Sequence, residues 1–96
     1  MPMHNPPHPG EFIREVSLDP FGVSARQVAA NLGVSPSTLN RLLNGYSNVS
    51  PEMALRLSKT FGRSPESWLA MQDAYDLYRA RKVVDLKSVK KMTFAA

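Results

Sequence analysis

A short stretch in the first half of the chain carries polar side chains at helical spacing. Four residues, Ser37, Asn40, Arg41 and Asn44, fall on the same side of an α-helix. Hydroxyl, amide and guanidinium groups arranged in this way can hydrogen-bond base edges in the major groove of DNA. For Arg41 the sequence leaves three alternatives open: a pair of hydrogen bonds to guanine O6 and N7, a contact with a phosphate, or a free position on the surface.

The opposite side of this stretch is predicted to face the protein interior. Ser35 is a candidate helix N-cap, and Pro36 suits the first helical position because an N–H there would have no partner. Together with the Asn44-Gly45 stop, these signals predict a recognition helix at about residues 36–44. Its predicted interior side carries Thr38, Leu39, Leu42 and Leu43.

A second short helix is predicted directly before the recognition helix. Ser24 is its candidate N-cap, and it should end at Gly33, because glycine adopts the left-handed backbone of a sharp helix exit. Val28, Ala29 and Leu32 give it one apolar stripe. Two helices that meet at a glycine turn predict a helix-turn-helix when the second helix is apolar on its interior side and polar on its outer side.

Polar residues on both sides of the recognition helix extend the predicted DNA contact. Arg26 and Gln27 open the leading helix, where a phosphate would meet free helix N–H groups. The residues from Tyr46 to Asn48 could donate to phosphates or could form a solvated loop, and Asn44 could equally cap its helix. The full set of predicted DNA-binding residues is Arg26, Gln27, Ser35, Ser37, Thr38, Asn40, Arg41, Asn44, Tyr46, Ser47 and Asn48.

Composition and charge fit a basic binding protein and argue against several other classes. The net charge is +4, and no acidic residue lies between Asp19 and Glu52, so nothing in the predicted reading segment repels phosphate. The chain has no cysteine, no HExxH motif and no glycine-rich phosphate loop, so we expect no enzyme, no metal and no cofactor. It also lacks a signal peptide and an apolar run of the ~20 residues that span a bilayer. We therefore expect a cytoplasmic protein without a membrane partner or small-molecule substrate.

Helix-start signals along the chain predict an all-α fold of five helices in a single domain. Residues 1–9 contain four prolines and predict an extended arm, residues 10–82 the helical part, and residues 83–96 a short tail. Ser50-Pro51 and Ser64-Pro65 begin the last two predicted helices, which end near Phe61 and Lys82. In the tail, Val84, Leu86, Val89 and Met92 could pack on a partner or fray.

The first predicted helix opens at Pro9, and a linker follows it. Phe12, Ile13 and Val16 are expected on the apolar side of this helix, and the linker is expected to bury Leu18, Pro20 and Phe21.

Several other side chains are assigned by their type and position. We expect His4 and His8 to be solvated, and Arg56 and Lys59 to face outward. Trp68 is expected in the core. Tyr75 and Tyr78 are predicted at a dimer interface, because they lie where the last helix outruns the compact bundle.

The chain resembles the lambda-repressor/Cro (XRE-type) helix-turn-helix family in the segments VAANLGVSPSTLNRLLNG and SPEMALRLSKTFG. More narrowly, HPGEFIRE at residues 8–15, SPEMALRL, and SPESWLAMQDAYDL at residues 64–77 resemble HigA-type antitoxins of bacterial toxin–antitoxin modules. The resemblance covers roughly residues 8–82. Many members of the wider family have glutamine or arginine where this chain has Pro36, which puts more weight on Ser37 and Arg41.

The resemblance implies a lambda-repressor-like bundle and two macromolecular partners. Such proteins are usually homodimers that bind an inverted repeat in their own promoter, and they also bind a small RelE/HigB-type toxin, an mRNA endonuclease. The chain would then neutralise the toxin and repress the operon. We expect the toxin to bind Pro6 to Val16, because this segment is expected to lie away from the DNA face. A stand-alone repressor without a toxin is the main alternative, and a protein-binding module that has lost DNA is a third.

Overall fold

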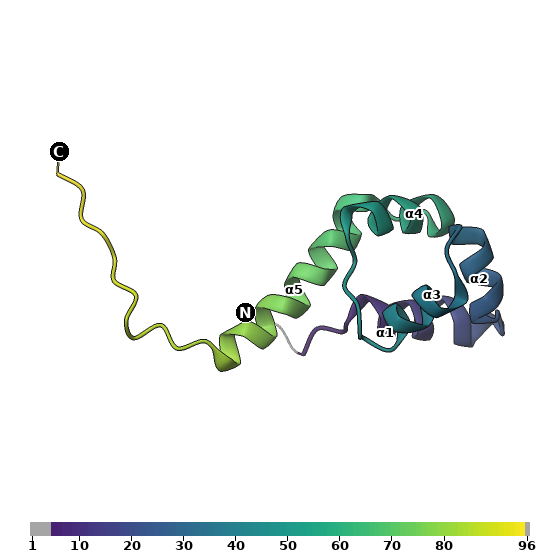
Figure 1. The fold of residues 1–96 in the computed structure, drawn as a ribbon, viewed down its shortest axis with the longest axis horizontal. Coiled ribbons are helices and arrows are strands. Elements are labelled where there is room, and N and C mark those ends of the chain that lie inside the picture. Colours follow the sequence, from purple (N-terminus) through teal and green to yellow (C-terminus); the bar gives the residue numbers. More distant parts are fainter. Residues whose placement is uncertain (1–4, 96) are drawn as a thin grey trace.

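The computed structural model describes residues 5–95, which form five α-helices and no strand (Figure 1). This confirms the predicted all-α fold; His4 lies outside the described residues. The helices are α1 (Pro9–Ile13), α2 (Ala25–Leu32), α3 (Pro36–Leu43), α4 (Pro51–Phe61) and α5 (Pro65–Val83). A π-helical turn, η1 (Arg14–Leu18), and a 3₁₀ turn, η2 (Asp19–Phe21), join α1 to α2.

Serine side chains cap the four longer helices. The hydroxyl oxygens of Ser24, Ser35, Ser50 and Ser64 each accept a hydrogen bond of 3.1 Å from the backbone N–H three residues later. Each bond satisfies one of the N–H groups that a helix start leaves without a partner. The starts predicted from the sequence for these four helices are therefore confirmed.

The hydrophobic core lies between the helices and centres on Trp68. This side chain is buried, as predicted, and its ring meets the ring of Phe12 edge-on at 5.9 Å between centroids. Phe61 packs against the same indole at 6.3 Å. The core also contains the inner leucines of α3, and this contact holds the recognition helix on the bundle.

The first helix packs directly on the C-terminal end of the recognition helix. A Cβ atom on Gly10 would lie 1.9 Å from the carbonyl oxygen of Leu42 and 2.9 Å from the Cα of Leu43. Only glycine fits this approach, since any side chain there would overlap the backbone of α3. Ile13, one turn later on α1, is fully buried.

Three apolar residues after α1 are exposed, contrary to prediction. The expected three-residue spacing places Val16 beneath Ile13, but the π-helical turn widens the helix, so that Leu18 becomes the buried neighbour five residues on. Phe21 is 75% exposed rather than buried, because the chain leaves η2 through the left-handed Gly22. Pro20, in the same turn, is also exposed.

The predicted solvated histidine in the arm is buried. His8 is only 5% exposed, because it is the N-cap of α1 and its Nδ1 accepts a hydrogen bond of 2.9 Å from the N–H of Gly10. Pro6 is buried as well, so the end of the arm belongs to the packed structure.

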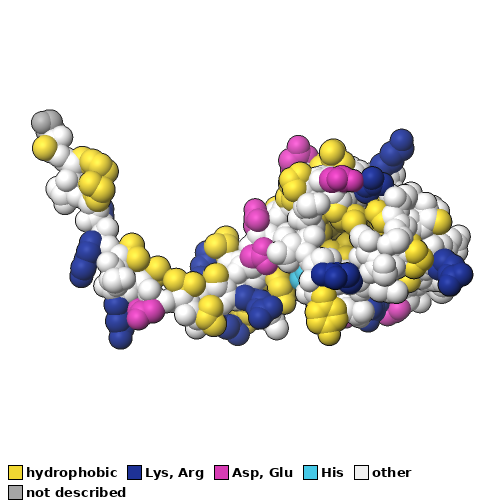
Figure 2. All heavy atoms as spheres, in the orientation of Figure 1, with side chains coloured by type: hydrophobic (Ala, Val, Ile, Leu, Met, Phe, Trp, Pro, Cys, Tyr) yellow, Lys and Arg dark blue, Asp and Glu magenta, His cyan; other side chains and the backbone are white. Residues whose placement is uncertain are grey.

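The last helix leads away from the bundle, and the tail continues beyond it (Figure 1). Residues 84–95 are exposed throughout and contain no helix. In Figure 2 apolar and basic side chains follow one another along this tail. Within residues 5–95, no helix combines the length and apolar character needed to cross a bilayer.

Candidate nucleic-acid interface

The outer face of α3 presents the side chains that the sequence predicts for DNA binding. Ser37, Asn40 and Arg41 are exposed, whereas the three leucines of the helix are buried. Thr38 is also exposed, which corrects its expected position on the interior side. Its place in the first turn, where its hydroxyl meets the capping serine, turns it toward solvent.

Three hydroxyl groups cluster at the start of α3. The oxygen of Ser35 accepts from the backbone N–H of Thr38 at 3.1 Å and lies 2.8 Å from the Thr38 hydroxyl and 3.2 Å from that of Ser37. Ser35 is committed to capping the helix. Ser37 and Thr38 retain hydroxyl groups that can donate or accept. These two residues carry the hydrogen-bonding capacity of the first turn.

The guanidinium group of Arg41 is available for an external acceptor. The residue is exposed in the last turn of α3, and the one ion pair found in residues 5–95 joins other residues, Arg56 and Glu52. A planar group with five N–H donors at this position can form two parallel hydrogen bonds with a guanine edge or bind a phosphate.

Asn44 is the C-cap residue of α3, and its side chain is engaged by a residue far away in the sequence. Its Oδ1 accepts a hydrogen bond of 3.0 Å from Nη2 of Arg14, which lies 30 residues earlier. The side chain therefore bonds across to η1, while the backbone N–H of Asn44 completes the helix by bonding the carbonyl of Asn40. Arg14 is absent from the predicted site, because only the folded chain brings η1 beside the end of α3.

The buried side chain of Gln72, on α5, forms hydrogen bonds with the loop after α3. Gln72 is 4% exposed; its Oε1 accepts from the N–H of Val49 at 2.8 Å, and its Nε2 donates to Oδ1 of Asn48 at 3.2 Å. The amide nitrogen of Asn48 still has donors, and Tyr46 is 78% exposed. Ser47 is half-buried. Gln72 is absent from the predicted site, although a polar residue one turn after Trp68, on the buried side of α5, is a detectable signal.

The start of α2 exposes both predicted phosphate contacts. Arg26 and Gln27 are exposed, and the backbone N–H of Gln27 bonds to the capping oxygen of Ser24. All eleven residues of the predicted DNA-binding set thus lie on α2, at the N-cap of α3, on α3 or in the loop after it, and ten of them are exposed.

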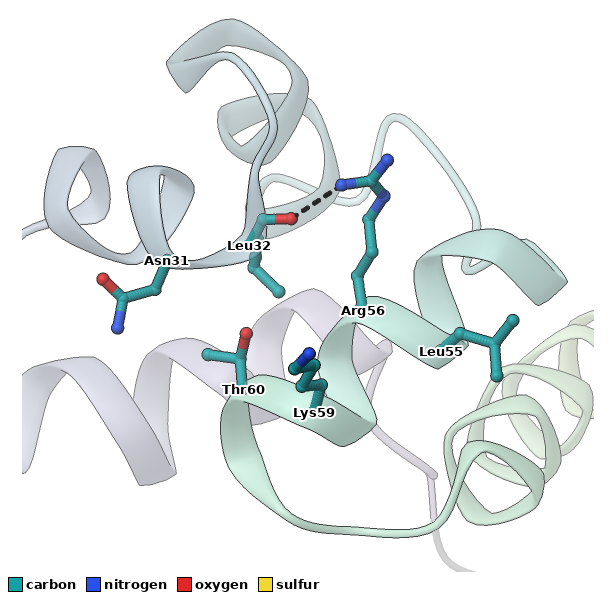
Figure 3. A pocket seen from close by; sticks show the side chains of 6 residues that line it. All are labelled: Asn31, Leu32, Leu55, Arg56, Lys59 and Thr60. Atoms are coloured by element: carbon teal, nitrogen blue, oxygen red, sulfur yellow. Dashed lines mark hydrogen bonds between the residues drawn. The ribbon is translucent and has the colours of Figure 1, made fainter.

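The end of α2 is held by Arg56 of α4, which corrects its expected outward orientation. Figure 3 shows this side chain extending from α4 to the carbonyl of Leu32. Nη1 donates to the Leu32 oxygen at 2.9 Å and to that of Gly33 at 3.2 Å, and Nη2 pairs with Glu52 at 2.9 Å. Carbonyls at a helix end have no partner within the helix, so the arginine supplies one. Lys59 is exposed, as predicted.

A family model described as helix-turn-helix matches residues 14–68, which is more than half of the chain. Antitoxin HigA-1 of Vibrio cholerae is 35% identical over 72 residues, covering 75% of this chain and 68% of that protein. A solved HigA-family antidote protein of Coxiella burnetii is 35% identical, with a TM-score of 0.85, covering 94% of this chain and all of its own. The chain belongs to the HigA-type branch of the helix-turn-helix family.

Two further relatives of this HigA-type protein bear on its function. It is 44% identical over 92 residues to an uncharacterized HTH-type transcriptional regulator, YddM, of Escherichia coli, covering 96% of this chain and 97% of that one. The Pseudomonas aeruginosa antitoxin HigA, solved with the higBA promoter, is 35% identical to this chain, with a TM-score of 0.75. The match covers 80% of this chain and 84% of the HigA chain. Regulators and antitoxins of this family are non-enzymatic, in agreement with the sequence analysis.

The two tyrosines predicted at a dimer interface of the HigA-type chain are half-buried on α5. The ring of Tyr75 meets the His8 ring edge-on at 5.0 Å, and its hydroxyl accepts from Nη1 of Arg79 at 3.1 Å. The ammonium group of Lys82 lies 4.4 Å from the centre of the Tyr78 ring. Both tyrosines line a cavity of about 570 Å³ between α5 and the arm. Their role in a dimer stays a prediction.

Proposed function

We propose that this HigA-type chain is a cytoplasmic antitoxin that binds operator DNA through α3 and represses its own operon. The observation that carries the proposal is the outer face of α3. Its serine, asparagine and arginine side chains are exposed, while the leucines on the opposite side of the helix are buried. No acidic residue interrupts the segment between Asp19 and Glu52. The face therefore offers donors to base edges and does not repel the phosphate backbone.

Relatives of known structure support the DNA-binding part of the proposal. The Pseudomonas aeruginosa HigA described above was solved with its promoter, and PA4674 of the same organism was solved with its operator DNA at 35% identity and a TM-score of 0.75. The predicted readers, from Ser37 to Asn44, belong to the helix that a helix-turn-helix inserts into the major groove.

The chain is proposed to act as a homodimer on an inverted repeat. A two-fold dimer would set two α3 helices about 34 Å apart, one turn of DNA, whereas a single small module buries too little surface for tight specific binding. Tyr75 and Tyr78 are the proposed contacts on α5. The exposed tail supports the proposal, because Leu86, Val89 and Met92 are each more than 60% exposed among the described residues 5–95. A solved antitoxin, GraA, is 39% identical to this chain and covers 94% of it, with a TM-score of 0.86. Residues 1–83 make up only about 86% of the chain, so the match to GraA extends into the tail.

A RelE/HigB-type toxin is the proposed second partner. The segment from Pro6 to Val16 remains the proposed contact, although the burial of Pro6 and His8 restricts it to exposed residues such as Glu15 and Val16. Removing residues 1–10 would also remove the Gly10 contact with α3, so a point substitution is the cleaner test. Val16→Asp should weaken capture of the toxin without unfolding the chain. Unchanged capture would exclude this part of the surface.

Operator binding tests the proposal directly. Fluorescence anisotropy with a duplex from the region upstream of the gene should show tight, salt-dependent binding. Arg41→Ala should weaken binding by roughly fivefold to 150-fold for each half-site, which corresponds to about 1–3 kcal/mol for a paired arginine–guanine contact. The matched control is Arg81→Ala, which removes the same charge from the exposed surface of α5. Equal binding by wild type and Arg41→Ala would contradict the proposed role of α3.

A stand-alone repressor is the second candidate function. It is favoured by the 44% identity to YddM over nearly the whole of both chains, since that relative is described only as a transcriptional regulator. Co-purification with the product of the neighbouring gene separates the candidates. A stable complex that inhibits mRNA cleavage supports the antitoxin, whereas operator binding with no such partner supports the repressor.

A further inference from the structure

The contact between Arg14 and Asn44 has a consequence for the chemistry of the α3 face. Arginine has only N–H donors, so the atom of Asn44 that meets it must be the carbonyl oxygen Oδ1. The orientation of the amide is thereby fixed. Its acceptor is occupied by Arg14, and its NH₂ group is turned away from that contact.

The guanidinium of Arg14 keeps most of its own donors. One of its five N–H groups serves Asn44, and the ion pair found within residues 5–95 does not involve Arg14. Both residues are exposed. Together they present an amide NH₂ and a cation side by side, with one lone pair of the Asn44 oxygen used by Arg14. Such a pair matches a ligand that carries only acceptors and a negative charge.

The first helix holds Arg14 at this position. Gly10 lies against the backbone of Leu42 and Leu43, and Ile13 is fully buried, so η1 starts beside the last turn of α3. The end of a helix carries exposed carbonyls and a partial negative charge, which favours a cation there. The backbone of Arg14 is thus placed by packing, and its side chain is oriented by the hydrogen bond to Asn44.

We propose that Arg14 and Asn44 together bind one phosphate of the DNA backbone, next to the bases read by α3. This inference rests on the proposed function, and adds to it a contact from outside the helix-turn-helix. The phosphate receives one hydrogen bond from the Asn44 amide and one or two from Arg14. Arg14 is also a positioning residue, because without it the amide of Asn44 can rotate and present its oxygen to the phosphate.

The test compares Arg14→Ala with the charge-matched control Arg81→Ala. Binding to the operator duplex and to an unrelated duplex is measured by anisotropy between about 50 and 300 mM salt. In the proposed homodimer the substitution removes one phosphate contact from each protomer, so binding to both duplexes should weaken by roughly a hundredfold. The slope of log K against log salt should fall by about 1.8. Arg81→Ala should follow wild type.

A second variant keeps the test valid if Arg14→Ala destabilises the fold. In Asn44→Asp a carboxylate oxygen still accepts from Arg14, so the melting temperature should be retained, while the donor facing the phosphate is lost. Binding to both duplexes should fall at least as much as in Arg14→Ala. The inference is overturned if Asn44→Asp binds like wild type, or if Arg14→Ala matches Arg81→Ala. It is equally overturned if Arg14→Ala weakens only operator binding with an unchanged salt slope, since that pattern indicates a base contact.

These outcomes are separable from failure of the proposed function. If wild type binds no operator, the proposed function fails before Arg14 is tested. If wild type binds and depends on Arg41 but not on Arg14, the proposed function stands and the phosphate contact is wrong.

Discussion

The contact between Gly10 and α3 makes a quantitative prediction about stability. An alanine at this position would put its Cβ 1.9 Å from the Leu42 oxygen, whereas ordinary contact begins at 3.4 Å. The two helices would therefore have to separate by about 1.5 Å. Overpacking of a core typically costs about 1–3 kcal/mol, and the obstacle here is backbone, which cannot rotate aside.

The expected loss for Gly10→Ala is about 2 kcal/mol after a smaller opposing effect is included. Alanine is a better helix former than glycine by roughly 0.5–1 kcal/mol, which offsets part of the strain. For a chain of 96 residues, this net loss lowers the melting temperature by about 10 °C. Thermal unfolding followed by circular dichroism at 222 nm measures it.

The control for this experiment is another glycine with free space around it. At Gly45 a Cβ would meet nothing within 4 Å, so Gly45→Ala carries only the cost of its positive φ, roughly 1 kcal/mol. Gly10→Ala should be the more damaging of the two. If it leaves the melting temperature unchanged, or raises it as helix propensity alone predicts, the close packing of α1 on α3 is wrong.

Two other predictions concern buried polar groups near the reading face. Burial lowers the pKa of His8 below its usual 6.5. This effect is larger than the opposite effects of the Ser47 backbone and of the charges of Asp76 and Glu11, which raise the pKa. The folded chain therefore binds this proton less readily than the unfolded chain, and stability should be lost as the pH falls below 6.5. His8→Asn keeps a capping acceptor without a titrating ring, so its melting temperature should vary less between pH 7.5 and 5.5; an identical pH profile would exclude His8 as the cause. Gln72→Leu leaves the buried N–H of Val49 without its acceptor and should cost about 1–3 kcal/mol in urea unfolding, with faster amide exchange at Val49. Wild-type exchange at that amide would show that the loop is held by other contacts.

The sequence predicted the helices and the reading face because both depend on local signals. A serine cap followed by proline marks the start of α3, α4 and α5, and the leucine spacing of α3 identifies which side is buried. These signals act within one or two turns, so they can be read without knowing the fold.

The errors fall where distant segments meet. His8 was expected in solvent because a proline-rich arm carries no local sign of its contact with Tyr75. Arg56 was expected outward because its charge says nothing of the carbonyls that α2 leaves open. α-Helical spacing predicts Val16 on the buried side, but the turn that contains it is π-helical. In each case the deciding contact or geometry is a property of the assembled chain.

The contact of α1 and η1 with α3 links the proposed toxin-binding surface to the proposed DNA-binding face. The segment from Pro6 to Val16 was expected to lie apart from the DNA face, yet Gly10 touches the backbone of α3 and Arg14 bonds its C-cap residue. A toxin bound to the exposed side of this segment would act on an element packed against the recognition helix. If the toxin shifts α1 and α3 follows, so that the affinity for DNA changes, then DNA changes the affinity for the toxin by the same factor. Binding at this surface and repression are therefore expected to be coupled, and the packing at Gly10 is the physical link between them.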